Sequence, residues 1–159
     1  MNASDILKYG HYTFLASLDG LSEAELEKGG VCGIWSTKDI IAHLTSYEHV
    51  LTEVLQGFLG GGDTPYMEQY VRGEVFNDLQ VGARKGKSPA ENLDEYNTTQ
   101  AKTIELIAQI TPETLRQSGT LPWYGMEYSL DDFIVYAFYG HKREHSAQIH
   151  VYRDTLKNS

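Results

Sequence analysis

The feature that most constrains the fold is a helix-start signal that recurs along the chain. A serine is followed three residues later by an acidic residue at Ser36, Ser88 and Ser129. In this capping box the hydroxyl accepts a hydrogen bond from the amide three residues on, and the carboxylate accepts one from the serine amide. Pro89 suits the first turn of a helix, and Ser4 offers a simpler N-cap near the start of the chain. The sequence therefore predicts four helices.

Each start is followed by apolar positions at steps of three and four, the spacing that lines one face of an amphipathic helix. No segment shows the sustained alternation that would predict a strand. The four sets of positions are Leu7, His11, Phe14 and Leu18; Ile40, Leu44, Tyr47, Leu51, Val54 and Phe58; Leu93, Tyr96, Gln100, Ile104 and Ile107; and Ile134, Ala137, Phe138, His141, His145, Ile149 and Tyr152.

The remaining segments are predicted to be connections. Three glycines at 60–62 end the second helix, since glycine accepts the positive φ found there. Residues 65–83 predict a short, less regular helix, and residues 111–128 predict a loop because prolines and a glycine interrupt them. The predicted fold class is all-α: a four-helix bundle with a long crossover connection that carries a short extra helix. Residues 1–159 are expected to form a single domain.

Charge and composition exclude several classes of partner. The 159 residues carry 13 Lys and Arg against 22 Asp and Glu, a formal charge of −9, so the surface would repel nucleic-acid phosphates and anionic membranes. Cys32 is the single cysteine, which excludes an intramolecular disulfide. The N-terminal residues are too polar for a signal peptide, and no apolar run approaches the ~20 residues of a membrane span. The prediction is a cytoplasmic protein with neither a nucleic-acid nor a membrane partner.

Three histidines share the phase of the apolar faces. His141 and His145 lie one helical turn apart, where Cβ atoms about 5–6 Å apart let both rings reach one ion. His43, three residues after Ile40, also points inward. Buried imidazoles are costly without partners, and one metal ion would partner all three. Such a site leaves a coordination position open and suits Zn, Ni, Cu or Fe. The alternative is a set of surface or hydrogen-bonded core histidines.

Further residues are candidates for lining or supporting this site. The polar helix residues among them would equally suit exposed positions, and the two aromatic residues, in the predicted loop, would equally suit covering the end of the core. His11 would either line the site or be a histidine that is hydrogen-bonded within the core. His49 and His150 are out of phase with the inward histidines, and Cys32 is expected to be a small buried residue. The candidates are His11, Glu48, Asn97, Gln100, Trp123 and Tyr124.

Several of these features combine into one longer pattern. A tryptophan and a cap precede Lys38-Asp39-Ile40-Ile41-Ala42-His43-Leu44, Phe76-Asn77 and Ser88-Pro89 follow, and His141-x-x-x-His145 comes late in the chain. This pattern resembles the DinB-like (damage-inducible) superfamily over essentially the whole chain. The resemblance implies a four-helix bundle, commonly a homodimer, in which His43, His141 and His145 bind one divalent ion, nickel or zinc.

The resemblance leaves three functions open. Some similar proteins are transferases that use a low-molecular-weight thiol such as bacillithiol or mycothiol, with glutathione as a further candidate cosubstrate. Others look like metal-dependent hydrolases. The third possibility is a stress-related protein that binds a small molecule without catalysis. We expect a metal-dependent thiol S-transferase that acts on small electrophiles.

Two surface features bear on ligands and assembly. Basic residues near the crossover would either bind the carboxylates of a thiol or form a solvated turn; they are Arg72, Arg84, Lys85 and Lys87. Aromatic residues that would reach the surface are candidates for a dimer contact; they are Tyr9, Tyr12, Tyr66 and Tyr70.

Overall fold

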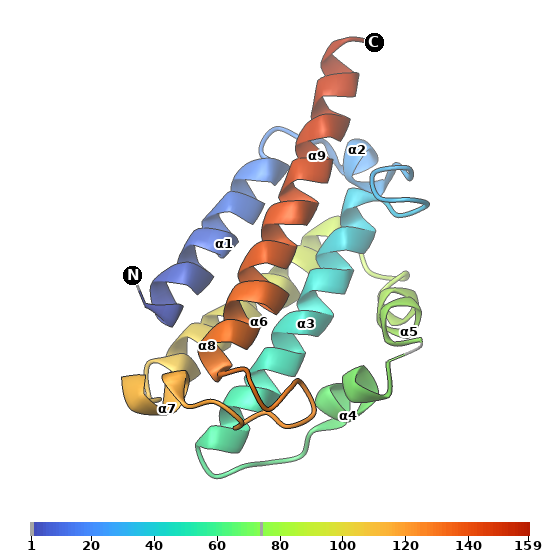
Figure 1. The fold of residues 1–159 in the computed structure, drawn as a ribbon. Coiled ribbons are helices and arrows are strands. Elements are labelled where there is room, and N and C mark those ends of the chain that lie inside the picture. Colours follow the sequence, from blue (N-terminus) through green and yellow to red (C-terminus); the bar gives the residue numbers. More distant parts are fainter. Residues whose placement is uncertain (1, 74) are drawn as a thin grey trace.

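The ordered elements of the chain are helices (Figure 1). The computed structural model describes residues 2–73 and 75–159, and within those ranges no strand forms; a lone bridge pairs Cys32 with Trp35. The prediction of an all-α fold is confirmed. None of the helices in the described ranges is both long enough and apolar enough to span a membrane.

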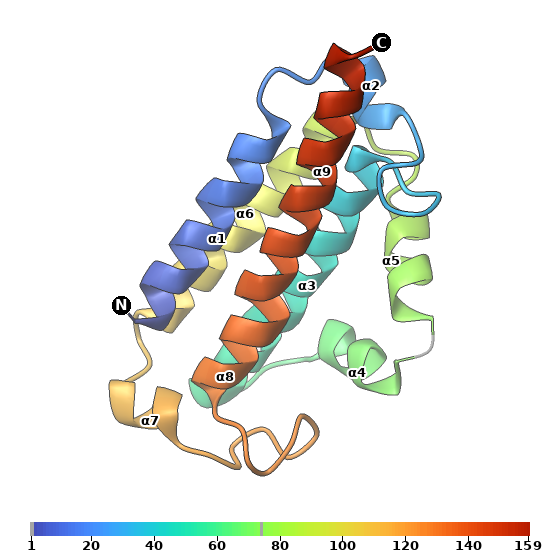
Figure 2. The ribbon, with the colours of Figure 1, turned by 45° about the horizontal axis from the view of Figure 1, so that its top comes forward.

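Four long helices lie side by side and enclose the core (Figures 1 and 2). They are α1, Ala3–Leu18; α3, Thr37–Phe58; α6, Pro89–Ile107; and α9, His141–Lys157. α3 packs most extensively on α6, and α9 packs on α1, whereas α3 and α9 make few close backbone contacts with each other. Fully buried aromatic side chains fill the interior; the largest are Phe14, Tyr96, Phe133 and Phe138.

The shorter helices occupy the connections between the long ones. α4 and α5 form the crossover from α3 to α6 and lie beside α3 (Figure 2). α8 continues through a π-helical turn, η1, directly into α9. The bounds are α2, Glu23–Glu27; α4, Pro65–Arg72; α5, Phe76–Ala83; α7, Pro112–Arg116; α8, Leu130–Ile134; and η1, Val135–Gly140.

The predicted capping boxes form at all three serines. Ser36, Ser88 and Ser129 accept hydrogen bonds of 3.1–3.2 Å from the amides three residues on, and the acidic side chains accept from the serine amides. The prediction that Ser4 caps the first helix is wrong. The side chain of Asn2 accepts from the Asp5 amide at 3.0 Å, so α1 begins two residues earlier than expected.

The connections differ from the prediction in two places. Residues 65–83 form two helices rather than one, because Gly73 adopts a φ of 81° that ends α4; residue 74 lies outside the described residues. α7 interrupts the predicted loop at 111–128. Thr111 accepts a hydrogen bond from the Thr114 amide at 3.3 Å, and Pro112 occupies the first turn, where a proline starts a helix instead of breaking one.

Candidate metal centre

Three histidines from two helices meet between α3 and α9. The Nε2 atoms of His43 and His141 are 2.9 Å apart, and those of His141 and His145 are 3.0 Å apart. Two nitrogens that each lie about 2.1 Å from one ion would be about 3.0 Å apart at a right angle and about 3.4 Å apart at the tetrahedral angle, so these separations are close to those of shared coordination. One ring nitrogen of each residue lies within 4.8 Å of the other two, and the three histidines could hold a single ion.

The ring nitrogens that point away from the centre explain why a cation suits the space between the three Nε2 atoms. Nδ1 of His145 lies 2.8 Å from Oε1 of Gln148, and the ring of His141 hydrogen-bonds the carbonyl of Ala137. An acceptor beside Nδ1 places the ring proton there, so Nε2 of each ring presents a lone pair. Two lone pairs 3.0 Å apart repel each other unless a cation or a proton lies between them. The donor set therefore fits a metal ion.

The three imidazoles are held in the neutral form that binds metals. Burial lowers the pKa of His43 to about 2, and the neighbouring His141 and His145 add to the effect. Burial also lowers the pKa of His141 to about 4. The pKa of His145 is lowered by burial as well, although its hydrogen bond to Gln148 opposes the shift.

The π-helical turn η1 supplies the acceptor for His141. In a regular α-helix the carbonyl of Ala137 would accept from the amide four residues later, which is that of His141. Here the His141 amide bonds to the carbonyl of Phe138 instead, and the His141 ring hydrogen-bonds the carbonyl of Ala137. Single π turns recur at functional sites. The turn was not predicted, because the three- and four-residue spacing of apolar positions continues through it.

Aromatic rings pack directly on the histidines. The ring of Trp35, in the loop before α3, lies 4.9 Å from the ring of His43. The ring of Tyr47 lies 4.8 Å from that of His43 and 4.6 Å from that of His141. These contacts place aromatic surface against the rings of His43 and His141 and restrict the planes of the two imidazoles.

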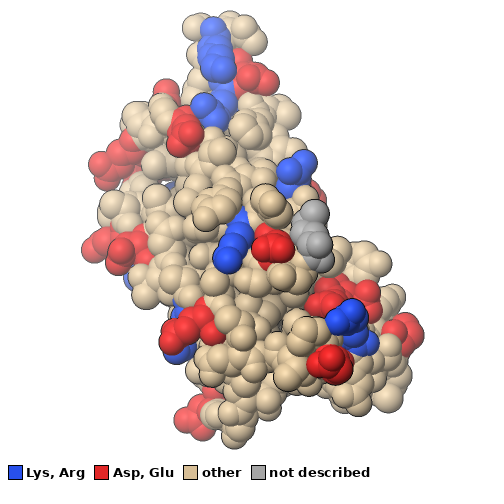
Figure 3. Space-filling model, turned by 90° about the vertical axis from the view of Figure 1, so that its left-hand side faces the viewer, with Lys and Arg blue, Asp and Glu red and all other residues tan. Residues whose placement is uncertain are grey.

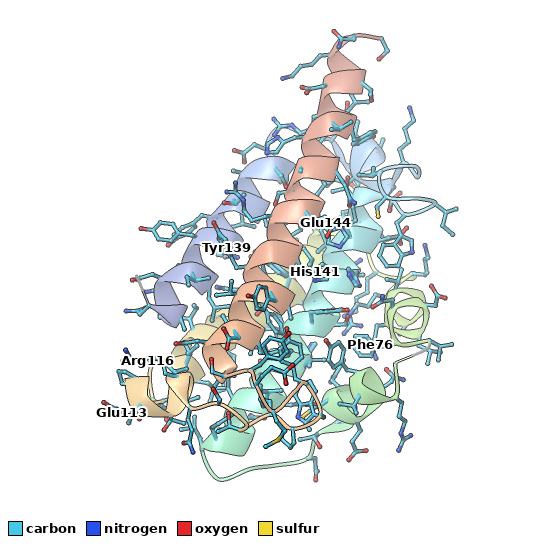
Figure 4. All side chains as sticks on the ribbon, viewed as in Figure 1. Phe76, Glu113, Arg116, Tyr139, His141 and Glu144 are labelled. Carbon is cyan, nitrogen blue, oxygen red and sulfur yellow. The ribbon has the colours of Figure 1, made fainter. Side chains whose placement is uncertain are left out.

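A second layer of aromatic residues comes from the crossover. Tyr70 of α4 and Phe76 of α5 pack on Tyr47 with ring centroids 5.5 and 5.8 Å away. In Figure 4, His141 lies between α9 and α3, and Phe76 lies on the side of α3 where α4 and α5 run. His141 is the one partly exposed member of the three histidines. Of the three imidazoles, this ring is therefore the one that solvent reaches.

Comparison with known families agrees with this geometry. The sequence model of the DinB superfamily matches residues 7–149, a range that includes all three histidines. The chain belongs to the DinB superfamily. Members of this superfamily typically bind metal ions. No curated protein and no solved structure matches the chain significantly.

Inside this DinB bundle, each long helix contributes to a buried polar group of side chains. We call the set His11, Glu48, Tyr96, Thr103 and Lys142 the polar core cluster. Glu48 and Lys142 form an ion pair, with side chains 0% and 2% exposed. Oγ1 of Thr103 donates to Oε2 of Glu48 at 3.1 Å, and Nδ1 of His11 lies 3.3 Å from Oη of Tyr96. Burial alone would lower the pKa of Lys142, but Glu48 and Tyr96 outweigh it and raise the pKa, so the amine stays charged.

The candidate residues take several positions in this DinB chain. His11 and Glu48 belong to the polar core cluster. Gln100 is buried on α6 and Asn97 is half-buried there, with an unpartnered Oδ1 among the described residues. The rings of Trp123 and Tyr124 lie 5.3 and 4.9 Å from that of Phe133 and cover that end of the core. That any of the six binds a ligand stays a prediction.

Two residues that bear on the centre were not predicted. Lys142 lies four residues after Phe138 and three before His145, the inward phase of α9, but it sits in a run of charged residues that predicts an exposed face. Gln148 follows His145 by three residues, a spacing at which helix side chains meet. In both cases the position of the residue on helix α9, rather than its residue type, indicates that it bears on the centre.

The basic residues of the crossover are engaged by carboxylates of the chain. Nη2 of Arg84 lies 2.8 Å and Nζ of Lys87 lies 2.6 Å from the carboxylate of Glu95, and Lys85 lies 2.7 Å from Asp39. Burial alone would raise the pKa of Glu95, but Arg84, Lys87 and His49 outweigh it and lower the pKa to about 2. Of the four basic residues considered, only Arg72 is exposed without a described ion pair.

The remaining histidines and the cysteine lie apart from the centre. His49 contacts Glu95 at 3.0 Å and stacks on Tyr66, and His150 is exposed, as their helical phase predicts. Cys32 is half-exposed rather than buried, because it lies in the loop between α2 and α3.

Proposed function

We propose that this chain binds one divalent ion, zinc or nickel, at His43, His141 and His145, and transfers a low-molecular-weight thiol to small electrophiles. The observation that carries the proposal is the convergence of three neutral imidazoles whose Nε2 atoms lie 2.9 and 3.0 Å apart at a partly exposed position. A bound ion would lower the pKa of a thiol that coordinates it, so the thiol would react as thiolate near neutral pH.

The surroundings of the centre favour a thiol over water as the nucleophile. Metal-dependent hydrolysis commonly recruits a carboxylate as general base beside the ion. Within the described ranges, no carboxylate hydrogen-bonds any of the three rings, and Glu48 is buried in its pair with Lys142. A thiol that loses its proton on coordination needs no such base.

The residues of the chain would orient the reactants and keep water away. Gln148 and the Ala137 carbonyl hold the proton of two rings on Nδ1, which keeps Nε2 available. Trp35 and Tyr47 cover the imidazoles, and Tyr70 and Phe76 extend the aromatic surface. This surface would suit the apolar body of a small electrophile.

The metal site is tested first by elemental analysis of protein purified without chelators. We expect close to one equivalent of a transition metal in the parent and much less in His43→Ala. His150→Ala is the matched control, because it removes an exposed imidazole from the same helix α9 that carries two of the ligands. Equal metal content in all three proteins would contradict the proposed site.

The chemistry is tested by supplying bacillithiol, mycothiol or glutathione with a reactive electrophile such as 1-chloro-2,4-dinitrobenzene. Conjugation above the uncatalysed rate, lost in His43→Ala and after chelation, supports the proposal. It should persist at pH 6, where a free thiol with a pKa of about 8.5 is mostly protonated. Ester hydrolysis in the absence of a thiol would contradict the transferase and indicate a hydrolase. Tight ligand binding without turnover would contradict both and indicate a non-catalytic binding protein.

A further inference from the structure

The ion pair of the polar core cluster joins the two helices that carry the three histidines. Glu48 lies on α3, five residues after His43, and Lys142 lies on α9, directly after His141. The pair therefore links α3 to α9 at nearly the level where the imidazoles meet. Both side chains are fully enclosed, and Nζ of Lys142 also lies 5.4 Å from the centre of the Tyr96 ring.

A protein core does not generally need a buried charged pair for its stability. Moving two charged groups out of water costs several kcal/mol for each ion, and apolar residues of the same volume often serve a core as well or better. A buried pair differs from an apolar contact in being selective for one geometry. Apolar side chains tolerate a slide of one helix along another, whereas a carboxylate and an amine that separate inside the core leave two unpaired charges.

Close backbone packing does little to set the register of α3 against α9 directly. α3 is packed on α6, and α9 is packed on α1, but α3 and α9 make few close backbone contacts. Shifting one helix by a single residue would move its side chains by about 1.5 Å along the axis. Such a shift would separate His43 from the two α9 histidines by more than a coordination site tolerates.

We propose that the Glu48–Lys142 ion pair is a positioning pair that fixes the register of α3 against α9 and so holds His43 within reach of an ion bound by His141 and His145. The inference rests on the proposed metal site. Thr103 supports it by donating to the second carboxylate oxygen of Glu48 at 3.1 Å, which fixes the direction of that carboxylate.

The test replaces the pair by apolar residues of similar size, Glu48→Leu with Lys142→Met, in the full chain. Metal affinity is measured by competition with a chromophoric chelator, and the visible absorption of the Co²⁺-loaded protein reports the coordination of the ion. We expect the chelator-treated double variant to melt at or above the temperature of the parent. Its metal affinity should be ten- to a hundredfold weaker, the range seen when residues that orient metal ligands are removed, with an altered Co²⁺ spectrum.

Ser17→Ala is the matched control, because it removes another buried polar contact, the hydrogen bond from Oγ of Ser17 to the Phe14 carbonyl on α1, without touching the α3–α9 link. It should bind metal within about threefold of the parent even if it is less stable. Parental affinity and spectrum in the double variant would overturn the positioning role while leaving the proposed metal site intact. If instead the parent itself binds no metal, or His43→Ala binds as the parent does, the proposed function is what fails.

A second double variant covers the case in which the first does not fold. Glu48→Gln with Lys142→Met removes both charges but keeps an oxygen to accept from Thr103. Weakened metal binding in this folded variant would support the positioning role. If both double variants unfold while Ser17→Ala folds, the pair is required for the fold itself and the proposal is overturned.

Discussion

At the scale of single residues, the three imidazoles differ in what holds the nitrogen that points away from the centre. His145 has the side chain of Gln148, and His141 has the carbonyl of Ala137. The buried Nδ1 of His43 has no partner in the described part of the chain. Orientation at His145 therefore depends on one replaceable side chain, whereas at His141 it depends on the backbone.

Gln148→Ala should weaken metal binding about tenfold or more, because the His145 ring loses the acceptor that keeps its proton on Nδ1. Gln148→Glu keeps an acceptor at that position and should bind at least as tightly as the parent. Competition with a chelator measures both. Gln109→Ala, which removes an exposed glutamine from the turn after α6, is the control. Parental affinity in Gln148→Ala would show that the hydrogen bond does not matter.

The sequence predicted the three converging histidines but not what surrounds them. Helical phase alone places His43, His141 and His145 inward, because each falls on an apolar stripe. Phase does not show that Lys142, in a charged run, finds Glu48 on another helix, since that depends on how α3 and α9 are aligned. Phase also missed the hydrogen bond from the His141 ring to the Ala137 carbonyl, because this carbonyl lies in the π-helical turn η1, which does not change the apolar spacing.

At the scale of elements, a capping box predicted the start of a helix best where apolar residues at helical spacing follow it and become buried. Ser36 and its partner Asp39 begin α3, which buries most of its length. Ser22 and Glu25 form an equivalent box at the start of α2, a five-residue helix with no buried residue. The α2 box was missed because no apolar stripe follows it to distinguish a helix from a loop.

Ser36→Ala should lower the free energy of unfolding by about 1 kcal/mol, the usual effect of losing a serine N-cap. The loss should be smaller for Ser22→Ala, because fraying of the exposed α2 leaves the core intact. Urea denaturation of the metal-free proteins measures both values. Metal affinity of Ser36→Ala should stay within about twofold of the parent, since His43 lies beyond the first turn of α3. Equal losses in the two variants would contradict this account.

At the scale of the whole molecule, two of the four tyrosines considered for a dimer contact remain available. Tyr9 and Tyr12 on α1 are 56% and 62% exposed. Tyr66 stacks on His49 and Tyr70 packs on Phe76, both in the crossover. On the α1 side of the molecule, charged side chains are scattered among broad uncharged areas (Figure 3). An exposed, weakly charged face of this kind suits contact with a second copy.

We expect a homodimer, with light scattering at micromolar concentration giving twice the chain mass of 17.9 kDa. Placing like charges in the patch with Tyr9→Glu and Tyr12→Glu should shift the mass to that of a monomer without loss of helix by circular dichroism. Val71→Glu, at a 49% exposed position on α4, should leave the dimer intact. A monomer mass for the parent would contradict the dimer, and a dimer in the double variant would contradict the α1 face.

The buried histidines also make the stability of the metal-free protein depend on pH. The pKa of His43 is lowered from 6.5 to about 2 and that of His141 to about 4, both chiefly by burial. The folded state keeps these rings neutral, whereas the unfolded chain takes up protons below pH 6.5. The stability tied to each ring is therefore fully present above pH 6.5 and is lost as the pH falls toward its folded pKa.

Urea denaturation of chelator-treated protein at pH 7, 6 and 5 should show this loss. Each such histidine contributes up to about 1.4 kcal/mol per pH unit once the pH is below 6.5. His43→Leu removes one of these protons and should flatten the slope between pH 6 and pH 5 by about that amount. The low pKa of Glu95, about 2 in the fold, affects stability only below pH 4.5 and does not enter this window. Identical slopes for His43→Leu and the parent would mean that the imidazole is not held neutral by burial.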